Sequence, residues 1–117
     1  IGGPTLGADP IVGAVAALAH IEKINLKTFI VRKVVKDYGM QRQIEGPALR
    51  KGEEVILVDD VATTGKALIE AKESLDRARL VADTAIVIVD RNEGACENLA
   101  KVGLRLESIF TVRDLGV

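Results

Sequence analysis

The chain has 117 residues, of which 48% are hydrophobic and 28% are charged, and its formal net charge is -1 at pH 7. This length and composition predict one soluble domain with a single core, and the near-neutral charge argues against a general nucleic-acid or membrane surface. Aromatic residues make up 3% and Trp is absent, which argues against base-stacking platforms. No apolar stretch is long enough for a membrane span, and a single cysteine, Cys96, excludes an internal disulfide and favours a cytoplasmic location.

A loop rich in glycine and proline, Gly2–Pro10, opens the chain after Ile1, which we interpret as the last residue of a strand. We therefore interpret residues 1–117 as one core domain taken from a longer protein. Pro10–His20 predicts a mostly apolar helix with Asp9 as its N-cap. A loop with many free backbone N–H groups at a helix start suits an anion, although a plain turn into a buried helix has the same composition.

A predicted strand, Leu26–Val31, leads into the most basic part of the chain. Between Lys27 and Lys51 there are seven basic and two acidic residues, so this segment carries five excess positive charges. Residues 32–47 show no helical periodicity and predict a long loop. Such a charge run is usually a solvated face, but beside anion-binding turns it also suits a loop that covers a polyphosphate and displaces water.

Residues 54–68 contain the most informative motif of the chain. Val55–Val58 predict a short buried parallel strand, and Asp59 and Asp60 follow at its carboxyl end, where open α/β sheets bind ligands. Thr63–Gly65 then form a turn into a helix that starts near Lys66, with free N–H groups and hydroxyls that suit a phosphate monoester. Carboxylates repel a phosphate unless they face hydroxyls or a metal, so the motif predicts a phosphorylated polyol as ligand. The alternative is an ordinary strand-to-helix turn with a solvated acid pair.

The next helix is predicted at Ala67–Arg79 from its strong helix formers. Its core-facing stripe is expected at Leu68, Ala71, Leu75 and Ala78. A buried strand, Thr84–Val89, follows, and Arg91 emerges at its carboxyl end. A guanidinium there either binds a planar carboxylate or is a surface residue at the sheet edge.

The last predicted elements are a helix through about Val102 and a strand, Leu104–Val112. In this helix we expect Cys96 and Leu99 to face the core. Four strands that alternate with helices or loops predict an α/β fold, with a mainly parallel twisted sheet flanked by helices. Three loops at the strand ends would then meet in one crevice.

The two acids, two intervening residues and Thr-Thr-Gly of the central motif resemble the phosphoribosyl diphosphate fingerprint of the type I phosphoribosyltransferases. The glycine spacing of a Walker loop is absent. The Gly2–Pro10 loop, the run Arg32–Gly39 and the run Asp90–Gly94 resemble segments of orotate phosphoribosyltransferases in the same order. The resemblance covers nearly the whole chain and implies the Rossmann-like fold of that family, without the N-terminal hood that closes over the base.

The resemblance also implies roles for the residues that carry it. Asp59 and Asp60 would orient the ribose hydroxyls and stabilise positive charge on the ring, and Lys36 would be the catalytic lysine. The 5-phosphate would be held by Thr63, Thr64 and the backbone of Ala62, Gly65, Lys66 and Ala67, and Val61 would lie among the substrate-binding residues. The diphosphate would contact Thr5, Leu6 and Gly7, with a cis Thr5–Leu6 peptide, and the basic residues Arg32, Lys33 and Lys36.

Further implications concern the base, the metal and the assembly. Arg91 would bind orotate, and Mg²⁺ would be held mainly by substrate and water rather than by protein ligands. The basic loop would reach into the site of a neighbouring subunit, which implies a homodimer. The one departure is Tyr38, where the family commonly has histidine; Tyr38 still donates a hydrogen bond but carries no positive charge.

The sequence therefore predicts an orotate phosphoribosyltransferase, which makes orotidine 5′-phosphate and diphosphate from orotate and phosphoribosyl diphosphate in pyrimidine biosynthesis. Two alternatives stay open. The first is a phosphoribosyltransferase-like regulator that binds nucleotide or nucleic acid, and the second is a phosphoribosyltransferase for a purine base. The retained acids and basic residues favour chemistry over regulation, and Arg91 favours an acidic base.

Overall fold

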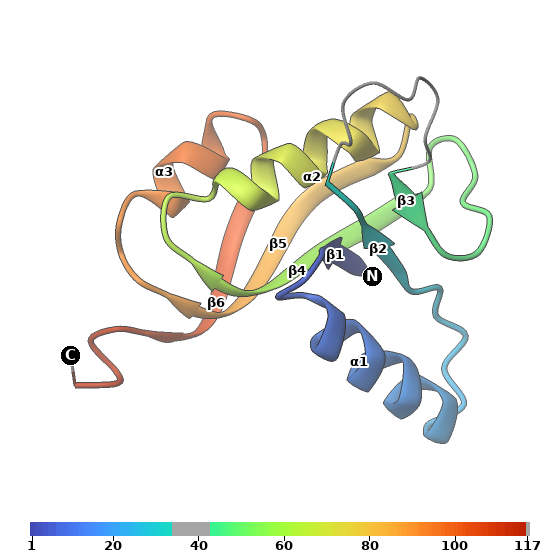
Figure 1. The fold of residues 1–117 in the computed structure, drawn as a ribbon, viewed down its shortest axis with the longest axis horizontal. Helices are drawn as coiled ribbons and strands as arrows, with labels where there is room; N and C mark the ends of the chain where they lie inside the picture. Colours follow the sequence, from blue (N-terminus) through green and yellow to red (C-terminus); the bar gives the residue numbers. More distant parts are fainter. Residues whose placement is uncertain (34–42, 117) are drawn as a thin grey trace.

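The computed structural model describes residues 1–33 and 43–116. Within these residues six strands form one sheet, in the order β3-β2-β1-β4-β5-β6 (Figure 1). The strands are β1 (Gly2–Pro4), β2 (Phe29–Val31), β3 (Ile44–Glu45), β4 (Glu54–Ala62), β5 (Val81–Asp90) and β6 (Arg105–Thr111). Neighbouring strands are parallel except for the pair β2 and β3. The predicted α/β class with a mainly parallel sheet is confirmed.

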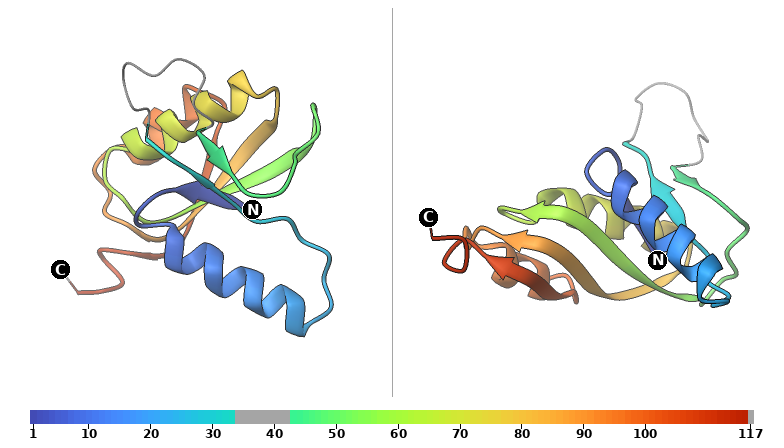
Figure 2. Two further views of the ribbon diagram at one scale, coloured as in Figure 1. Left: turned by 45° about the vertical axis from the view of Figure 1, so that its right-hand side comes forward. Right: turned by 90° about the horizontal axis from the view of Figure 1, so that it is seen from below.

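Helices cover both faces of this sheet, with α1 (Asp9–Ile21) on one face and α2 (Lys66–Arg77) and α3 (Ala95–Ala100) on the other (Figures 1 and 2). Consecutive residues of β4 divide between the two faces, as the pleat requires. Leu57 packs in the larger core with residues of α2 and α3, whereas Val58 packs with Val12 of α1. None of the helices described here is long and apolar enough to cross a membrane.

The first strand, β1, lies where the sequence predicts a loop. It is only three residues long, yet it lies in the middle of the sheet between β2 and β4. Its two glycines make this possible, because their neighbours leave no room for a side chain. A Cβ added at Gly2 would lie 2.4 Å from the Phe29 side chain, and one at Gly3 would lie 1.9 Å from the Val58 carbonyl oxygen.

The second unpredicted strand, β3, pairs antiparallel with β2. Two residues are too few to show a periodicity, so nothing in the basic segment marks them as a strand. The predicted strand at 26–31 is also shorter in the structure and begins at Phe29. The described residues thus form two more strands than the four that the sequence predicts, and both are short.

Three side-chain predictions are wrong. Asp9 is not the N-cap of α1: the cap is Ala8, whose carbonyl accepts the first helical bond from Val12, and Asp9 accepts a hydrogen bond from Thr5 instead. Ala78 is exposed because α2 ends before it, and Ser74 is buried in the stripe. Cys96 is exposed rather than core-facing, because α3 turns Ala95 and Leu99 toward the sheet.

Candidate active site

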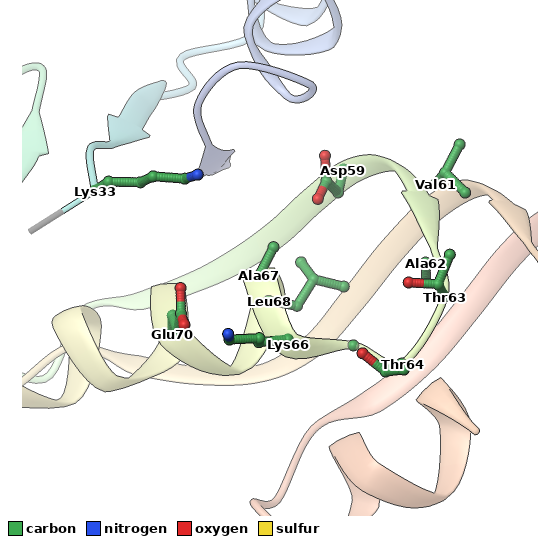
Figure 3. A pocket seen from close by; sticks show the side chains of 11 residues that line it. Lys33, Asp59, Val61, Ala62, Thr63, Thr64, Lys66, Ala67, Leu68 and Glu70 are labelled. Atoms are coloured by element: carbon green, nitrogen blue, oxygen red, sulfur yellow. The ribbon is translucent and has the colours of Figure 1, made fainter. Parts of the chain in front are cut away.

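The turn Thr63–Gly65, which we call the phosphate loop, joins β4 to α2 as the sequence predicts (Figure 3). The strand is longer than predicted, because β4 continues to Ala62, so the acid pair lies within the strand near its carboxyl end and not after it. A cavity of about 620 Å³ opens above this junction. It is lined by Lys33, Asp59, Val61, Ala62, Thr63, Thr64, Gly65, Lys66, Ala67, Leu68 and Glu70. All six residues predicted to hold a 5-phosphate, and Val61 beside them, therefore line one cavity. The N-terminal turn of α2 supplies free N–H groups and the positive end of the helix dipole to it.

Gly65 is the N-cap of α2 and has a left-handed backbone, with φ 89°. A side chain there would be strained by this φ, and it would also lie 3.2 Å from Leu99 of α3. The residue therefore has two reasons to be glycine. Its backbone turns the chain tightly enough for the loop to lie against α3 on one side and to line the cavity on the other.

The two adjacent acids differ in their surroundings. Asp59 is buried, with 7% of its surface exposed, and lines the cavity, whereas Asp60 is exposed and lies outside the lining. The Asp60 N–H donates to Asp59 Oδ1 at 2.9 Å, and the Val61 N–H donates to Asp60 Oδ1 at 2.7 Å. Each carboxylate is thus oriented by the backbone N–H that follows it, which leaves its second oxygen for another partner.

Burial raises the pKa of the Asp59 carboxyl from its ordinary value of 3.8 to about 7. The hydrogen bond from the Asp60 N–H favours the charged form and opposes this rise, while the nearby Asp60 carboxyl adds to it. At neutral pH, therefore, Asp59 lies near the midpoint of its titration in the protein without ligand. A bound group that favours the carboxylate would shift it to the charged form.

We expect the titration of Asp59 to make the protein less stable as the pH rises from about 4 to about 7. In this window the unfolded chain has already released the proton that the native state still holds, so ionisation works against folding. Asp59→Asn has no such proton. Its free energy of unfolding, relative to the parent protein, should therefore increase by roughly 2–4 kcal/mol across the window. Urea denaturation at several pH values measures this, and a difference that stays constant with pH would contradict the raised pKa.

The loop after β1 brings Gly7 against the acid pair. A Cβ built on Gly7 would lie 2.5 Å from Asp60 Oδ1 and 2.8 Å from Asp59 Oδ1. The Thr5–Leu6 peptide is cis, as the resemblance implies, and the Leu6 side chain is 79% exposed. The loop after β1 therefore meets the carboxyl-terminal part of β4, although Gly7 and Asp59 are far apart in the sequence, so one ligand can contact both.

Lys33, in the basic segment, lies on the far side of the cavity from the phosphate loop (Figure 3). Lys33 lines the main cavity and also an adjoining one of about 260 Å³, which it shares with Thr5 and Arg32. Arg32 forms an exposed ion pair with Glu45 at 2.9 Å. Lys36 and Tyr38 lie outside the described residues. Of the three diphosphate contacts predicted in this segment, Arg32 and Lys33 thus lie near the Thr5 loop.

Arg91 is close to the site through its backbone but not through its side chain. Its N–H donates to the Ala62 carbonyl at 3.0 Å, which joins the loop after β5 to the phosphate loop. The guanidinium is exposed, pairs with Glu93 at 3.3 Å and does not line the main cavity. The three loops predicted to meet therefore do lie together, but the Arg91 side chain points elsewhere in this structure.

Sequence reasoning missed Glu70, which lines both cavities. It lies four residues after Lys66 on α2, so the helical period already places the two on one face. It also missed the contacts that α3 makes with the phosphate loop, where Asn98 donates to the Thr64 carbonyl at 2.8 Å. No local pattern marks that contact, because 34 residues separate the partners.

Comparison with known proteins agrees with this geometry. The phosphoribosyl transferase domain family matches residues 3–113. The chain is 42% identical to the orotate phosphoribosyltransferase of a Nostoc species over 98% of its length, and 45% identical to that of Natronomonas pharaonis over 98%. It spans 56% and 63% of these two relatives, which is less than two thirds of either.

A solved structure is similar as well. The orotate phosphoribosyltransferase of Mycobacterium tuberculosis, in complex with 5-phospho-alpha-D-ribosyl 1-diphosphate, is 34% identical and superposes with a TM-score of 0.80. The similarity covers 98% of this chain and 63% of that one. With the family match over residues 3–113, the sheet order and the loop that joins β4 to α2, the chain belongs to the phosphoribosyl transferase domain family.

Proposed function

We propose that the chain forms the catalytic core of an orotate phosphoribosyltransferase. The enzyme would form a bond between the ribose anomeric carbon of phosphoribosyl diphosphate and a ring nitrogen of orotate, while the bond to diphosphate breaks. The observation that carries the proposal is the cavity in which the Thr63–Ala67 loop, the Asp59 carboxylate and Lys33 meet. The relatives named orotate phosphoribosyltransferase support the choice of base.

In this proposal the 5-phosphate binds to the loop at the start of α2. The Thr63 and Thr64 hydroxyls and the N–H groups of Gly65, Lys66 and Ala67 are its donors. A phosphate at a helix N-terminus is stabilised by these N–H groups and by the helix dipole together. With the phosphate held there, the ribose extends along the cavity toward the end of β4 and the acid pair.

The two acids would then hold the ribose diol. The transition state places positive charge on the ribose ring as the diphosphate departs, so a carboxylate near the ring stabilises it more than it stabilises the substrate. Asp59 and Asp60 each have one oxygen fixed by a backbone N–H, which preorganises them for this task. Gly7 would let the diphosphate side of the ligand come close to the same two carboxylates, because its missing side chain leaves room beside them.

The departing diphosphate would lie between the Thr5–Gly7 loop and the basic segment. Lys33 and Arg32 border that space, together with the acids Glu70 and Glu73. Lys36, as catalytic lysine, and Tyr38 would complete this side of the site. Their charges and hydrogen bonds would favour the diphosphate as it gains negative charge.

Mg²⁺ fits the donor set of this site. The described residues contain no cluster of three or more His, Cys, Asp or Glu side chains, so there is no protein cage around the acid pair. Mg²⁺ commonly keeps several waters and binds one or two carboxylates together with substrate phosphate oxygens. When bound, the ion would neutralise negative charge on the diphosphate.

The base would be recognised by Arg91. In the structure Arg91 forms an exposed ion pair with Glu93, and exposed ion pairs contribute little to the stability of a protein. The carboxylate of orotate can therefore replace Glu93, since a guanidinium binds a planar carboxylate through two parallel hydrogen bonds. We also propose a homodimer in which the basic segment serves the neighbouring site, and a cytoplasmic location, where Cys96 would stay a thiol.

The test is the formation of orotidine 5′-phosphate when the protein is given phosphoribosyl diphosphate, orotate and Mg²⁺. Chromatography measures the product, and diphosphate release gives a second readout. Product formed with hypoxanthine or adenine, and not with orotate, would favour the purine alternative. Salt-dependent binding of nucleic acid, with no product from any base, would favour a regulator.

Asp60→Asn tests the role of the acid pair in this reaction. The amide keeps the shape but removes a negative charge near the ribose ring, so kcat/KM should fall roughly 10- to 100-fold. Asp83→Asn is the matched control, because Asp83 is exposed and lies near the start of β5, away from the acid pair. Equal rates for the two variants would refute the assignment of Asp60.

A further inference from the structure

Helix α3 contacts the phosphate loop on the side that faces away from the main cavity. Asn98 Nδ2 donates to the Thr64 carbonyl oxygen at 2.8 Å, and Leu99 and Ala95 pack beneath Gly65. Figure 3 shows α3 on the side of Thr64 that faces away from Asp59 and Lys33. Asn98 lines a depression behind the loop and does not line the main cavity. Its contact is therefore with the loop and not with the proposed ligand.

The hydrogen bond from Asn98 also determines the direction of the Gly65 N–H, because the Thr64 carbonyl and the Gly65 N–H belong to one peptide bond. In a trans peptide the carbonyl of one residue and the N–H of the next lie in one plane and point in opposite directions. The only cis peptide of the described chain is Thr5–Leu6, so the Thr64–Gly65 peptide is trans. Because its carbonyl points to Asn98, its N–H points away from α3, toward the cavity that Gly65 lines.

The Gly65 N–H has no hydrogen-bond partner in the part of the chain that the structure describes. Nothing in the loop's own sequence fixes the peptide plane, since Gly65 tolerates many backbone conformations and Thr64 is exposed. A reversed plane would direct a carbonyl oxygen, with its partial negative charge, at the bound anion. The hydrogen bond from Asn98 is the contact that selects the other orientation.

We propose that Asn98 is a positioning residue for phosphate binding, which holds the Thr64–Gly65 peptide so that the Gly65 N–H donates to the 5-phosphate. This role rests on the proposed function, because it needs a phosphate in the loop. It concerns one end of the ligand only. The loss of Asn98 should weaken the phosphate end and leave the diphosphate end unchanged.

Calorimetric titration with ribose 5-phosphate and, separately, with inorganic diphosphate tests this division. Asn98→Ala should weaken ribose 5-phosphate binding roughly 5- to 10-fold, as expected for one lost hydrogen bond and a freed peptide, and leave diphosphate binding unchanged. Asn98→Asp should weaken it at least as much, because a carboxylate of the same shape cannot donate to the carbonyl. Glu97→Gln, at the neighbouring exposed position of α3, is the control and should bind both like the parent.

The amide signal of Gly65 in an NMR titration supplies a readout that a general loss of stability would not change. In the parent protein ribose 5-phosphate should move this signal strongly downfield, and in Asn98→Ala the shift should be much smaller. If the parent binds both probes and Asn98→Ala keeps the same affinity and the same Gly65 shift, the positioning role is wrong and the proposed function stands. A parent that binds neither probe would overturn the proposed function and the positioning role together.

Discussion

Replacing Gly7 by Ala is expected to lower the affinity for phosphoribosyl diphosphate about 100-fold while the protein stays folded. The new methyl group would lie 2.5 Å from Asp60 Oδ1 and 2.8 Å from Asp59 Oδ1, so both carboxylates must rotate away. These are side-chain ends, and the Gly7 backbone is not left-handed, so the change displaces the acids rather than the chain. Loss of two charged hydrogen-bond acceptors, at about 1.5 kcal/mol each, gives this factor.

Calorimetry and urea denaturation of the same variant separate binding from stability. Gly13→Ala is the matched control, because Gly13 lies on α1 with nothing within 4 Å of the added methyl group. That variant should bind like the parent and be more stable by about 0.5–1 kcal/mol, since Ala is the better helix former. Undiminished affinity in Gly7→Ala would mean that the acid pair does not contact the ligand.

The part of the site that could be predicted is the part that is contiguous in sequence. Val55–Val58, the acid pair and Thr63–Gly65 lie within a few residues of one another, so the order strand, turn and helix determines where each group lies, although β4 continues to Ala62 and contains both acids. The buried strand β5 was predicted for the same reason, because an apolar run between turn residues is a local signal. For such segments, local chemistry and tertiary structure agree.

The parts that could not be predicted depend on contacts between distant residues. β1 is a strand because Phe29 and Val58 lie on either side of its glycines, although Gly-Gly-Pro by itself predicts a loop. The contact of Gly7 with the acids and that of Asn98 with Thr64 have no spacing that a sequence pattern can express. Cys96 was misplaced for a related reason, because a six-residue helix has too few turns to define its buried face.

These long-range contacts explain how separate loops come together beside the main cavity at the end of β4. β4 lies between β1 and β5, so the loops that leave these three strands emerge side by side at one edge of the sheet. The loop after β1 meets the acids at Gly7, and the loop after β5 is joined to Ala62 by the Arg91 N–H. The strand order, more than any single motif, therefore determines which groups can act on one ligand.

Replacing Gly3 by Ala should cost more than about 4 kcal/mol of the free energy of unfolding, because a Cβ there would lie 1.9 Å from the Val58 carbonyl oxygen and 2.8 Å from Ala8 Cβ. Unlike the carboxylates at Gly7, this oxygen belongs to the backbone of β4 and cannot rotate away, so β1 must leave its place between β2 and β4. A domain of this size has roughly 5–15 kcal/mol of stability, so much of the protein should be unfolded at 37 °C.

Thermal and urea denaturation followed by circular dichroism measure this loss, with Gly13→Ala again as the control that should gain stability. Gly3 and Gly7 are four residues apart and undergo the same substitution, yet one should affect folding and the other binding. The reason is that Gly3 lies against main chain and Gly7 against side chains. A Gly3→Ala variant as stable as the parent would show that β1 does not pack between β2 and β4 at the described distance, and that the loop after it is not held in place by the sheet.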